Sequence, residues 1–249
     1  MTRVLLLGGT TEASALARRL ADARVEAVFS YAGRTESPGT QPLPTRIGGF
    51  GGAGGLAEYI RSAGFTHVID ATHPFAVQMS RNAAAACAET GTPLCAFERE
   101  PWTAGPGDEW RHVADVGAAV DALPDTPARI FLAIGKQNLA AFGAKPQHHY
   151  LLRLVDPPEG PLPLPDADAL IARGPFTEAE DLRLLINHRI DLIVAKNSGG
   201  AGARAKLDAA RLHQVPVVLI DRPAMPPRRV ARDVDGVMAF LAHRADLGV

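Results

Sequence analysis

The chain has 249 residues, of which 47% are hydrophobic and 21% charged, and this balance excludes an intrinsically disordered protein. The formal charge is −1, which disfavours non-specific binding to nucleic acid or to an anionic membrane. Cys87 and Cys95 form no C-x-x-C pattern, which excludes a disulfide scaffold or a cysteine-rich zinc site. The first apolar run, residues 4–7, is too short for a signal peptide, and no run approaches the length of a membrane span. We therefore expect a soluble, reduced, cytoplasmic protein.

In the first half of the chain, short runs rich in leucine or β-branched residues alternate with alanine-rich amphipathic segments, which is typical of a parallel sheet covered by helices. Strands are predicted at 4–7, 25–31, 67–71 and 93–97. Helices are predicted at 12–23, 56–63 and 76–90, with a loop at 37–45. The proline-containing stretch 123–127 is predicted to link a first domain, residues 1–124, to a second, residues 125–249.

The same alternation of apolar runs and amphipathic segments is repeated in the second half of the chain. Strands are predicted at 130–134, 149–154, 169–172, 192–195 and 217–220. Helices are predicted at 137–142, 177–189, 204–213 and 234–243. Thr177 and Glu180 fit a capping box, and the basic run 228–232 is expected to be a solvated edge. The predicted fold is two doubly wound, Rossmann- or flavodoxin-like parallel-sheet α/β domains that flank a cleft.

Ligands of such sheets bind beyond the carboxyl ends of the strands, so the residues after each strand carry the functional prediction. The first strand is followed by a glycine pair, two threonines and an acid: Gly8, Gly9, Thr10, Thr11 and Glu12. Bare glycine backbone and a helix N-terminus suit a nucleotide phosphate. The spacing departs from G-x-G-x-x-G, and a tight turn capped by threonine is the alternative.

The second strand ends at Ser30 and Tyr31, and no carboxylate follows before Glu36. A site selective for NAD commonly has an acid here, whereas Arg34 stands where a 2′-phosphate needs a cation. The pattern therefore favours NADPH, with a solvated loop arginine as the alternative. Residues 48–55 include six glycines and are either a flexible loop or a place where a ligand passes close to the backbone.

The strand predicted at 67–71 is followed by Thr72, His73, Pro74, Phe75 and Ala76. Pro74 is a favoured first helical residue, so a hydroxyl, an imidazole and a helix N-terminus are expected to converge. His73 is interpreted as a contact to substrate or nicotinamide, or as a structural histidine. No second histidine or cysteine stands at ligand spacing, and no metal is expected.

In the second half, three predicted strands end in cations, which favours an anionic ligand over chance solvation. Lys136, Arg173 and Lys196 follow the strands, and Asn197, Ser198, Gly199 and Gly200 continue the last of these ends. This glycine-rich end does not match a P-loop but suits carboxylates. Arg153 is expected to join these cations.

Four strings occur in the order of a known family. They are Gly8-Gly9-Thr10-x-Glu12-Ala13, Asp70-Ala71-Thr72-His73-Pro74-Phe75-Ala76, Arg173-Gly174-Pro175-Phe176 and Lys196-Asn197-Ser198-Gly199-Gly200-x-Gly202. From about residue 3 to residue 245, the chain resembles the precorrin-6A reductase (cobalt-precorrin-6A reductase) family of cobalamin biosynthesis.

The resemblance implies an NADPH-dependent oxidoreductase acting on a CH–CH bond of a polycarboxylate tetrapyrrole. The resemblance further implies that hydride would go to carbon 19 and a proton to carbon 18 of precorrin-6A, giving precorrin-6B. The cofactor residues would be Gly8, Gly9, Thr10, Thr11, Glu12, Ser30, Arg34, Thr72, Pro74 and Phe75. The substrate residues would be His73, Ala76, Lys136, Arg173, Lys196, Asn197, Ser198, Gly199 and Gly200. The proton donor stays open among His73, a bound water and the nitrogens of the substrate.

Three other functions are weighed against this one. Short-chain dehydrogenases need Tyr-x-x-x-Lys, but Tyr31, Tyr59 and Tyr150 are followed four residues later by threonine, alanine and leucine. A two-domain sugar-nucleotide transferase would share the architecture but would not oxidise NADPH. A non-enzymatic NADP-sensing module would bind cofactor but would have no use for the basic strand ends of the second half.

Overall fold

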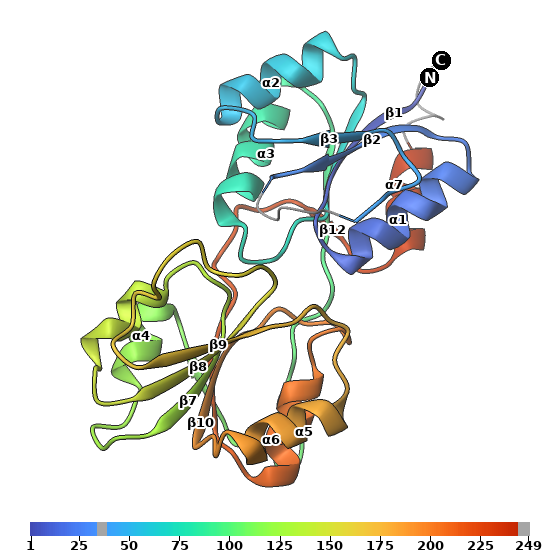
Figure 1. Cartoon of the computed structure of the whole chain (residues 1–249). Helices are drawn as coiled ribbons and strands as arrows, with labels where there is room; N and C mark the ends of the chain where they lie inside the picture. The colour runs from blue at the N-terminus through green and yellow to red at the C-terminus, as the bar shows by residue number, and fades with distance from the viewer. Residues whose placement is uncertain (34–38, 244–249) are drawn as a thin grey trace. The chain divides into compact units, whose positions relative to one another are not determined.

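The computed structural model describes residues 1–33 and 39–243, which form two compact units (Figure 1). The first unit comprises residues 1–100 and the segment from Ala224 onward, and the second comprises Pro101–Pro223. The second unit is thus inserted into the first, which differs from the boundary expected near residue 124. Residues 123–127 instead lie within the second unit, because the strand and helix before them belong to its fold.

The first unit contains a six-stranded, fully parallel sheet. Its order is β3 (Thr45–Ile47), β2 (Glu26–Tyr31), β1 (Arg3–Leu7), β4 (His67–Asp70), β5 (Leu94–Phe97) and β12 (Arg229–Ala231). The direction of winding therefore reverses between β1 and β4. In an open α/β sheet, this reversal opens a crevice at the carboxyl ends of the two central strands.

Helices cover both faces of this sheet (Figure 1). They are α1 (Thr11–Asp22), α2 (Ala53–Ser62), α3 (Val77–Thr90) and α7 (Val234–His243). Val4 and Leu6 face α1 and α7, whereas Leu5 and Leu7 face α2 and α3. This alternation explains why β1 is an unbroken apolar run: a strand buried on both faces has no solvent side. Phe240 and Leu241 of α7 complete the first core, which is why the chain returns to this unit.

The second unit repeats this design with a second parallel sheet. Its order is β6 (Trp110–Val113), β11 (Val217–Ile220), β10 (Leu192–Lys196), β7 (Arg129–Ala133), β8 (His149–Leu154) and β9 (Ala167–Ile171). Its helices are α4 (Val116–Asp121), η1, a 3-10 helix (Leu139–Ala144), α5 (Glu178–Asn187) and α6 (Ala205–His213). Figure 1 shows α5 and α6 on one face and α4 on the other. Here the winding reverses between β10 and β7.

The predicted fold class, two doubly wound parallel-sheet α/β units, is confirmed. The capping box of α5 is confirmed as well: Thr177 Oγ1 accepts from the Glu180 N–H at 3.2 Å, and the Glu180 carboxylate accepts from the Thr177 N–H at 2.8 Å. Four elements were not predicted, namely β3, β6, β12 and α4. The helix predicted at 137–142 is the 3-10 helix η1.

The basic run 228–232 is not a uniformly solvated edge. The side chain of Arg228 is only 9% exposed, pairs with the Glu98 carboxylate, and lies 3.9 Å from Asp70. Arg228, directly before β12, is held inward by these acidic groups, whereas Arg229, Val230 and Arg232 are exposed although β12 pairs with β5. Within residues 1–33 and 39–243, no helix is both long enough and apolar enough to cross a membrane.

Candidate functional site

The two glycines after β1 have different roles. The Gly8 N–H donates to the Ser30 carbonyl at 2.9 Å, and a Cβ on Gly8 would lie 2.1 Å from Cζ of Phe29. Glycine at position 8 is therefore required by packing against a buried ring. Gly9 has a φ of +123°, and a Cβ there would meet nothing within 4 Å. The open backbone that could receive a ligand is thus at Gly9.

Thr10 joins the ends of the two central strands. Its Oγ1 accepts from the Ala13 N–H at 3.1 Å, which caps α1, and donates to the Ala71 carbonyl at 2.9 Å. The capping interpretation and the ligand interpretation of this residue are therefore compatible, since the cap places the N-terminus of α1 at the strand reversal. Next to it, the Thr11 hydroxyl donates to the Glu12 carboxylate at 3.0 Å.

The end of β4 is held by a buried carboxylate. Asp70 is 3% exposed and accepts from the Thr72 hydroxyl at 2.6 Å and from the Thr72 N–H at 3.2 Å. These two bonds fix the direction in which the chain leaves the sheet. They also make Asp70 a supporting residue for Thr72, which was predicted to contact the cofactor.

His73 belongs to a tight turn after this strand end. Its Nδ1 accepts from the Phe75 N–H at 3.2 Å, and the two rings lie 5.8 Å apart. The Ala76 N–H donates to the His73 carbonyl at 2.7 Å, so Pro74 and Phe75 occupy the corner of the turn. The helix α3 begins at Val77, one residue after the start of the helix predicted at 76–90, and Pro74 lies in the turn before it and not in the first turn of the helix.

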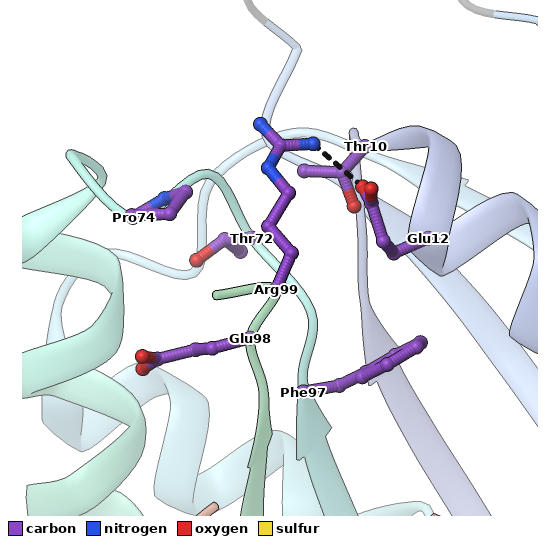
Figure 2. Close-up of a pocket in the computed structure, with 7 residues that line it drawn as sticks. All are labelled: Thr10, Glu12, Thr72, Pro74, Phe97, Glu98 and Arg99. Carbon is purple, nitrogen blue, oxygen red and sulfur yellow. Dashed lines mark hydrogen bonds and ion pairs between the residues drawn. The ribbon is translucent and has the colours of Figure 1, made fainter. Parts of the chain in front are cut away.

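Four residues predicted to bind cofactor line one notch of the first unit. Figure 2 shows Thr10, Glu12, Thr72 and Pro74 together with Phe97, Glu98 and Arg99 at the end of β5. The notch is small in this structure, with a cavity volume of about 10 Å³. The sequence reasoning missed Glu98 and Arg99, although both follow the strand predicted at 93–97 and the strand-end rule could have found them.

Arg99 and Glu12 form an ion pair across this notch, with 2.7 Å between Nη1 and Oε2. Burial, the largest single influence, acts to raise the pKa of Glu12, but the hydrogen bond and charge of Arg99, together with hydrogen bonds from the backbone and from Thr11, lower this pKa below its usual value. Glu12 is therefore an anion at neutral pH.

The end of β2 contains Ser30, which is buried and accepts from Nη1 of Arg46 at 3.3 Å. Arg46 also donates to the Gly48 carbonyl at 2.6 Å and the Gly49 carbonyl at 2.7 Å, and its guanidinium stacks 3.8 Å from the centre of the Phe50 ring. The glycine-rich loop is thus fastened by an arginine that the sequence reasoning missed. Arg34, the predicted 2′-phosphate residue, lies outside the described residues.

In the second unit, the end of β10 is built around an amide. The side chain of Asn197 accepts from the Trp102 N–H at 2.7 Å and donates to the Trp102 carbonyl at 3.0 Å. Arg222 donates to the carbonyls of Asn197 and Ser198, each at 3.0 Å. Gly199 and Gly200 follow with φ of +68° and +73°. Asn197 therefore has a supporting role in this structure, in addition to its predicted contact with substrate.

The predicted cations of this unit are held to different degrees. Lys136 and Arg173 each lie 3.9 Å from a carboxylate, and their side chains are 55% and 54% exposed. Arg173 also lines a cavity of about 340 Å³ with Arg153 and Phe176. Arg153 differs, because it is buried in an ion pair with Asp181 at 2.8 Å and stacks 4.0 Å from the Phe176 ring.

Lys196 is half-buried at the last position of β10. Lys196 therefore ends β10, and Lys136 follows β7; these are the two central strands, between which the winding reverses. The described part of the chain contains no group of three or more histidine, cysteine or acidic residues that could hold a metal ion.

Comparisons with known proteins agree with this organisation. The family described as "Precorrin-6x reductase CbiJ/CobK" matches residues 3–242. A precorrin-6A reductase of Rhodobacter capsulatus is 68% identical over 242 residues, covering 97% of this chain and 96% of the relative. A precorrin-6A reductase of Sinorhizobium sp. is 51% identical over 242 residues, with 97% and 93% covered. A solved structure of "CobK precorrin-6A reductase" superposes with a TM-score of 0.95 at 67% identity, covering 98% and 97% of the two chains. The chain therefore belongs to the precorrin-6x reductase CbiJ/CobK family.

Proposed function

We propose that this protein reduces precorrin-6A in cobalamin biosynthesis and that it uses NADPH to do so. NADPH would supply the hydride, delivered to carbon 19, while a proton adds to carbon 18, so that precorrin-6B and NADP⁺ are formed. Family membership and the names of the relatives support the substrate and the reaction class. The cofactor and the two carbon atoms are inferences beyond those names.

One observation carries the cofactor assignment: Thr10 Oγ1 donates to the Ala71 carbonyl, at the point where the sheet winding reverses. The bond holds the N-terminus of α1 beside the end of β4, and the open backbone of Gly9 directly precedes this N-terminus in the chain. A helix N-terminus with accessible N–H groups favours a pyrophosphate. The residues present therefore fit a dinucleotide in the first unit.

The second unit would bind the carboxylate arms of the macrocycle. Lys136 is more than half exposed and lies 3.9 Å from Glu159, so an arriving carboxylate can replace this partner at small cost. Arg173, which is also more than half exposed, would add a second positive charge. Lys196 and the glycine-rich segment Ser198–Gly200 would add a third anion contact. The near-neutral total charge does not oppose this role, because a small polyanion responds to the local sign of charge.

The chain's contribution to the chemistry would be mainly positional. Holding two reacting atoms about 3–3.5 Å apart in a site that excludes water accounts for a large part of many enzymatic rate enhancements. His73 is the candidate contact in the first unit, and its Nδ1 accepts a backbone hydrogen bond, which assigns the proton of the neutral ring to Nε2. The proton donated to carbon 18 is left unassigned among His73, water and the substrate nitrogens.

The direct test is NADPH oxidation by the purified protein with precorrin-6A, with and without cobalt, and with stereospecifically deuterated cofactor. We expect loss of NADPH absorbance that depends on the macrocycle, with deuterium transferred from one face of the nicotinamide. Nucleotide binding without NADPH consumption would contradict the proposal and would favour a nucleotide-sensing module or a transferase.

Two variants separate the roles of the units. Arg34→Ala should weaken NADPH binding far more than NADH binding, and equal losses would remove the 2′-phosphate assignment. Lys196→Ala should raise the KM for the macrocycle. A loss confined to NADPH binding would move this strand end to the cofactor.

A further inference from the structure

The ion pair between Glu12 and Arg99 lies where the proposed function places an anion. Glu12 is in the first turn of α1, and Arg99 follows β5, 87 residues later. Their side chains are 24% and 16% exposed, and both line the notch that contains Thr10 and Thr72 (Figure 2). The pair therefore forms part of the wall of the proposed cofactor site.

A carboxylate is an unexpected group beside a pyrophosphate site. The N-terminus of α1 stabilises the negative charge of Glu12, but it would also attract the phosphates of a dinucleotide to the same turn. Two negative groups within a few ångströms repel each other strongly in a partly buried site. Binding of the anion thus requires that the charge of Glu12 be cancelled locally.

The charge balance of the notch identifies Arg99 as the residue that cancels it. Glu98, the other carboxylate in the lining, is matched by Arg228 and by Arg232, whose Nη1 lies 3.8 Å away. For Glu12, Arg99 is the ion-pair partner that the structure shows among the described residues. Without Arg99, the notch would present an uncompensated carboxylate to the incoming phosphates.

We propose that Arg99 is a positioning residue that sets cofactor affinity by neutralising Glu12 at the phosphate-binding end of α1. This inference rests on the proposed function, since the anion is taken to be the pyrophosphate of NADPH. The proposal adds a residue outside the glycine–threonine turn to the cofactor site. It also predicts that removing Arg99 lowers cofactor affinity only while Glu12 keeps its negative charge.

The experiment measures the Kd of NADPH and of NADH by fluorescence titration of the full-length chain. Arg99→Met should weaken both nucleotides by roughly tenfold or more, because both contain the pyrophosphate. Arg99→Lys should retain most of the affinity, since it keeps the charge. Adding Glu12→Gln to Arg99→Met should restore the Kd to within about threefold of wild type. The loss caused by Arg99→Met should shrink as salt is raised from about 0.05 M to 0.5 M.

A matched control comes from the same unit. Arg61 and Glu89 form an ion pair of similar length, 2.8 Å, and neither residue lines the notch. Arg61→Met should therefore leave both Kd values unchanged, and circular dichroism should show that every variant is folded.

The outcomes distinguish this inference from the proposed function. If the wild type binds neither nucleotide, the proposed function fails and this inference fails with it. If the wild type binds both but Arg99→Met does so equally well, or the double variant is as weak as Arg99→Met, neutralisation of Glu12 is refuted while the proposed function stands.

Discussion

Replacing Gly8 by alanine tests whether the first glycine of the pair serves packing or ligand binding. The added Cβ would lie 2.1 and 2.3 Å from two ring carbons of Phe29, well inside van der Waals contact. Phe29 is fully buried between the strands and α1, so the ring has little room to move. We expect Gly8→Ala to lower the free energy of unfolding by about 1–3 kcal/mol, the usual cost of overpacking a core.

The physical cause can be isolated with a second substitution. Phe29→Leu removes the ring atoms that the new Cβ would strike, at a cost of its own of about 1–2 kcal/mol. In the double variant the overlap no longer exists, so the total loss should fall short of the sum of the single losses by roughly 1–3 kcal/mol. Gly9→Ala is the matched control, because its Cβ would meet nothing and its cost comes from the positive φ alone. Phe29→Leu should not relieve that cost.

The assay is urea unfolding followed by far-UV circular dichroism, which reports the helices of both units and so includes the first. Tryptophan fluorescence is not suitable for this unit, since Trp102 and Trp110 both lie in the second. If the losses from Gly8→Ala and Phe29→Leu add to within about 0.5 kcal/mol, the packing explanation is refuted. Gly8 would then be required for another reason, such as close approach of a ligand.

Three further predictions concern other buried groups. Asn197→Ala should lower the free energy of unfolding of the second unit by about 2–4 kcal/mol, because the buried N–H and C=O of Trp102 both lose their hydrogen-bond partner. A change below about 0.5 kcal/mol in unfolding followed by tryptophan fluorescence would contradict this. Arg153→Met should cost about 3–5 kcal/mol by leaving Asp181 buried and unpaired, and Asp181→Asn in the same chain should recover part of the loss. Burial, followed by the charge of Asp70, raises the pKa of Cys87 to about 12, so only ~10⁻⁴ of this thiol is thiolate at pH 8. A thiol reagent at pH 8 should therefore label Cys87 much more slowly in the native protein than in urea, and equal labelling rates would refute this.

The central strands were predictable because they are buried on both faces. β1 of the first unit and β10 of the second contain the apolar runs Val4–Leu7 and Leu192–Ala195, since side chains on both faces of such a strand meet a helix layer. β4 is equally buried, but only Val68 and Ile69 of its four residues are apolar. The start of α5 was predictable for a different reason: the capping box is formed by residues three apart and needs no distant partner.

The missed strands lie at sheet edges. β3, β6 and β12 contain three or four residues each, and most of those residues are partly or fully exposed. An edge strand can be this polar because only one of its sides pairs with another strand and few of its side chains are buried in the core. The pairing of β12 with β5 also joins segments more than 130 residues apart, and no local pattern records it. The domain boundary was misplaced for the same reason, since β6 and β12 determine which unit each connecting segment belongs to.

Because ligands of these sheets bind beyond the carboxyl ends of the strands, the residues after each strand were predicted as ligand contacts. Some of these residues are instead required by packing or by hydrogen bonds within the protein. Gly8 lies against Phe29, and Asn197 is hydrogen-bonded to the backbone of Trp102, so the demands of packing extend past the last residue of the strand. Neither demand is visible locally, because it is set by a neighbouring strand in one case and by a segment 95 residues away in the other. By contrast, Gly9 and Lys136 are not constrained in this way. A Cβ on Gly9 would meet nothing within 4 Å, and Lys136 is a half-exposed cation 3.9 Å from its carboxylate partner. The two units share the order of five strands and differ in where the edge strand, β12 or β6, falls in the chain. They also differ in these unconstrained positions, where bare backbone in the first unit and positive charge in the second can be selected for a ligand.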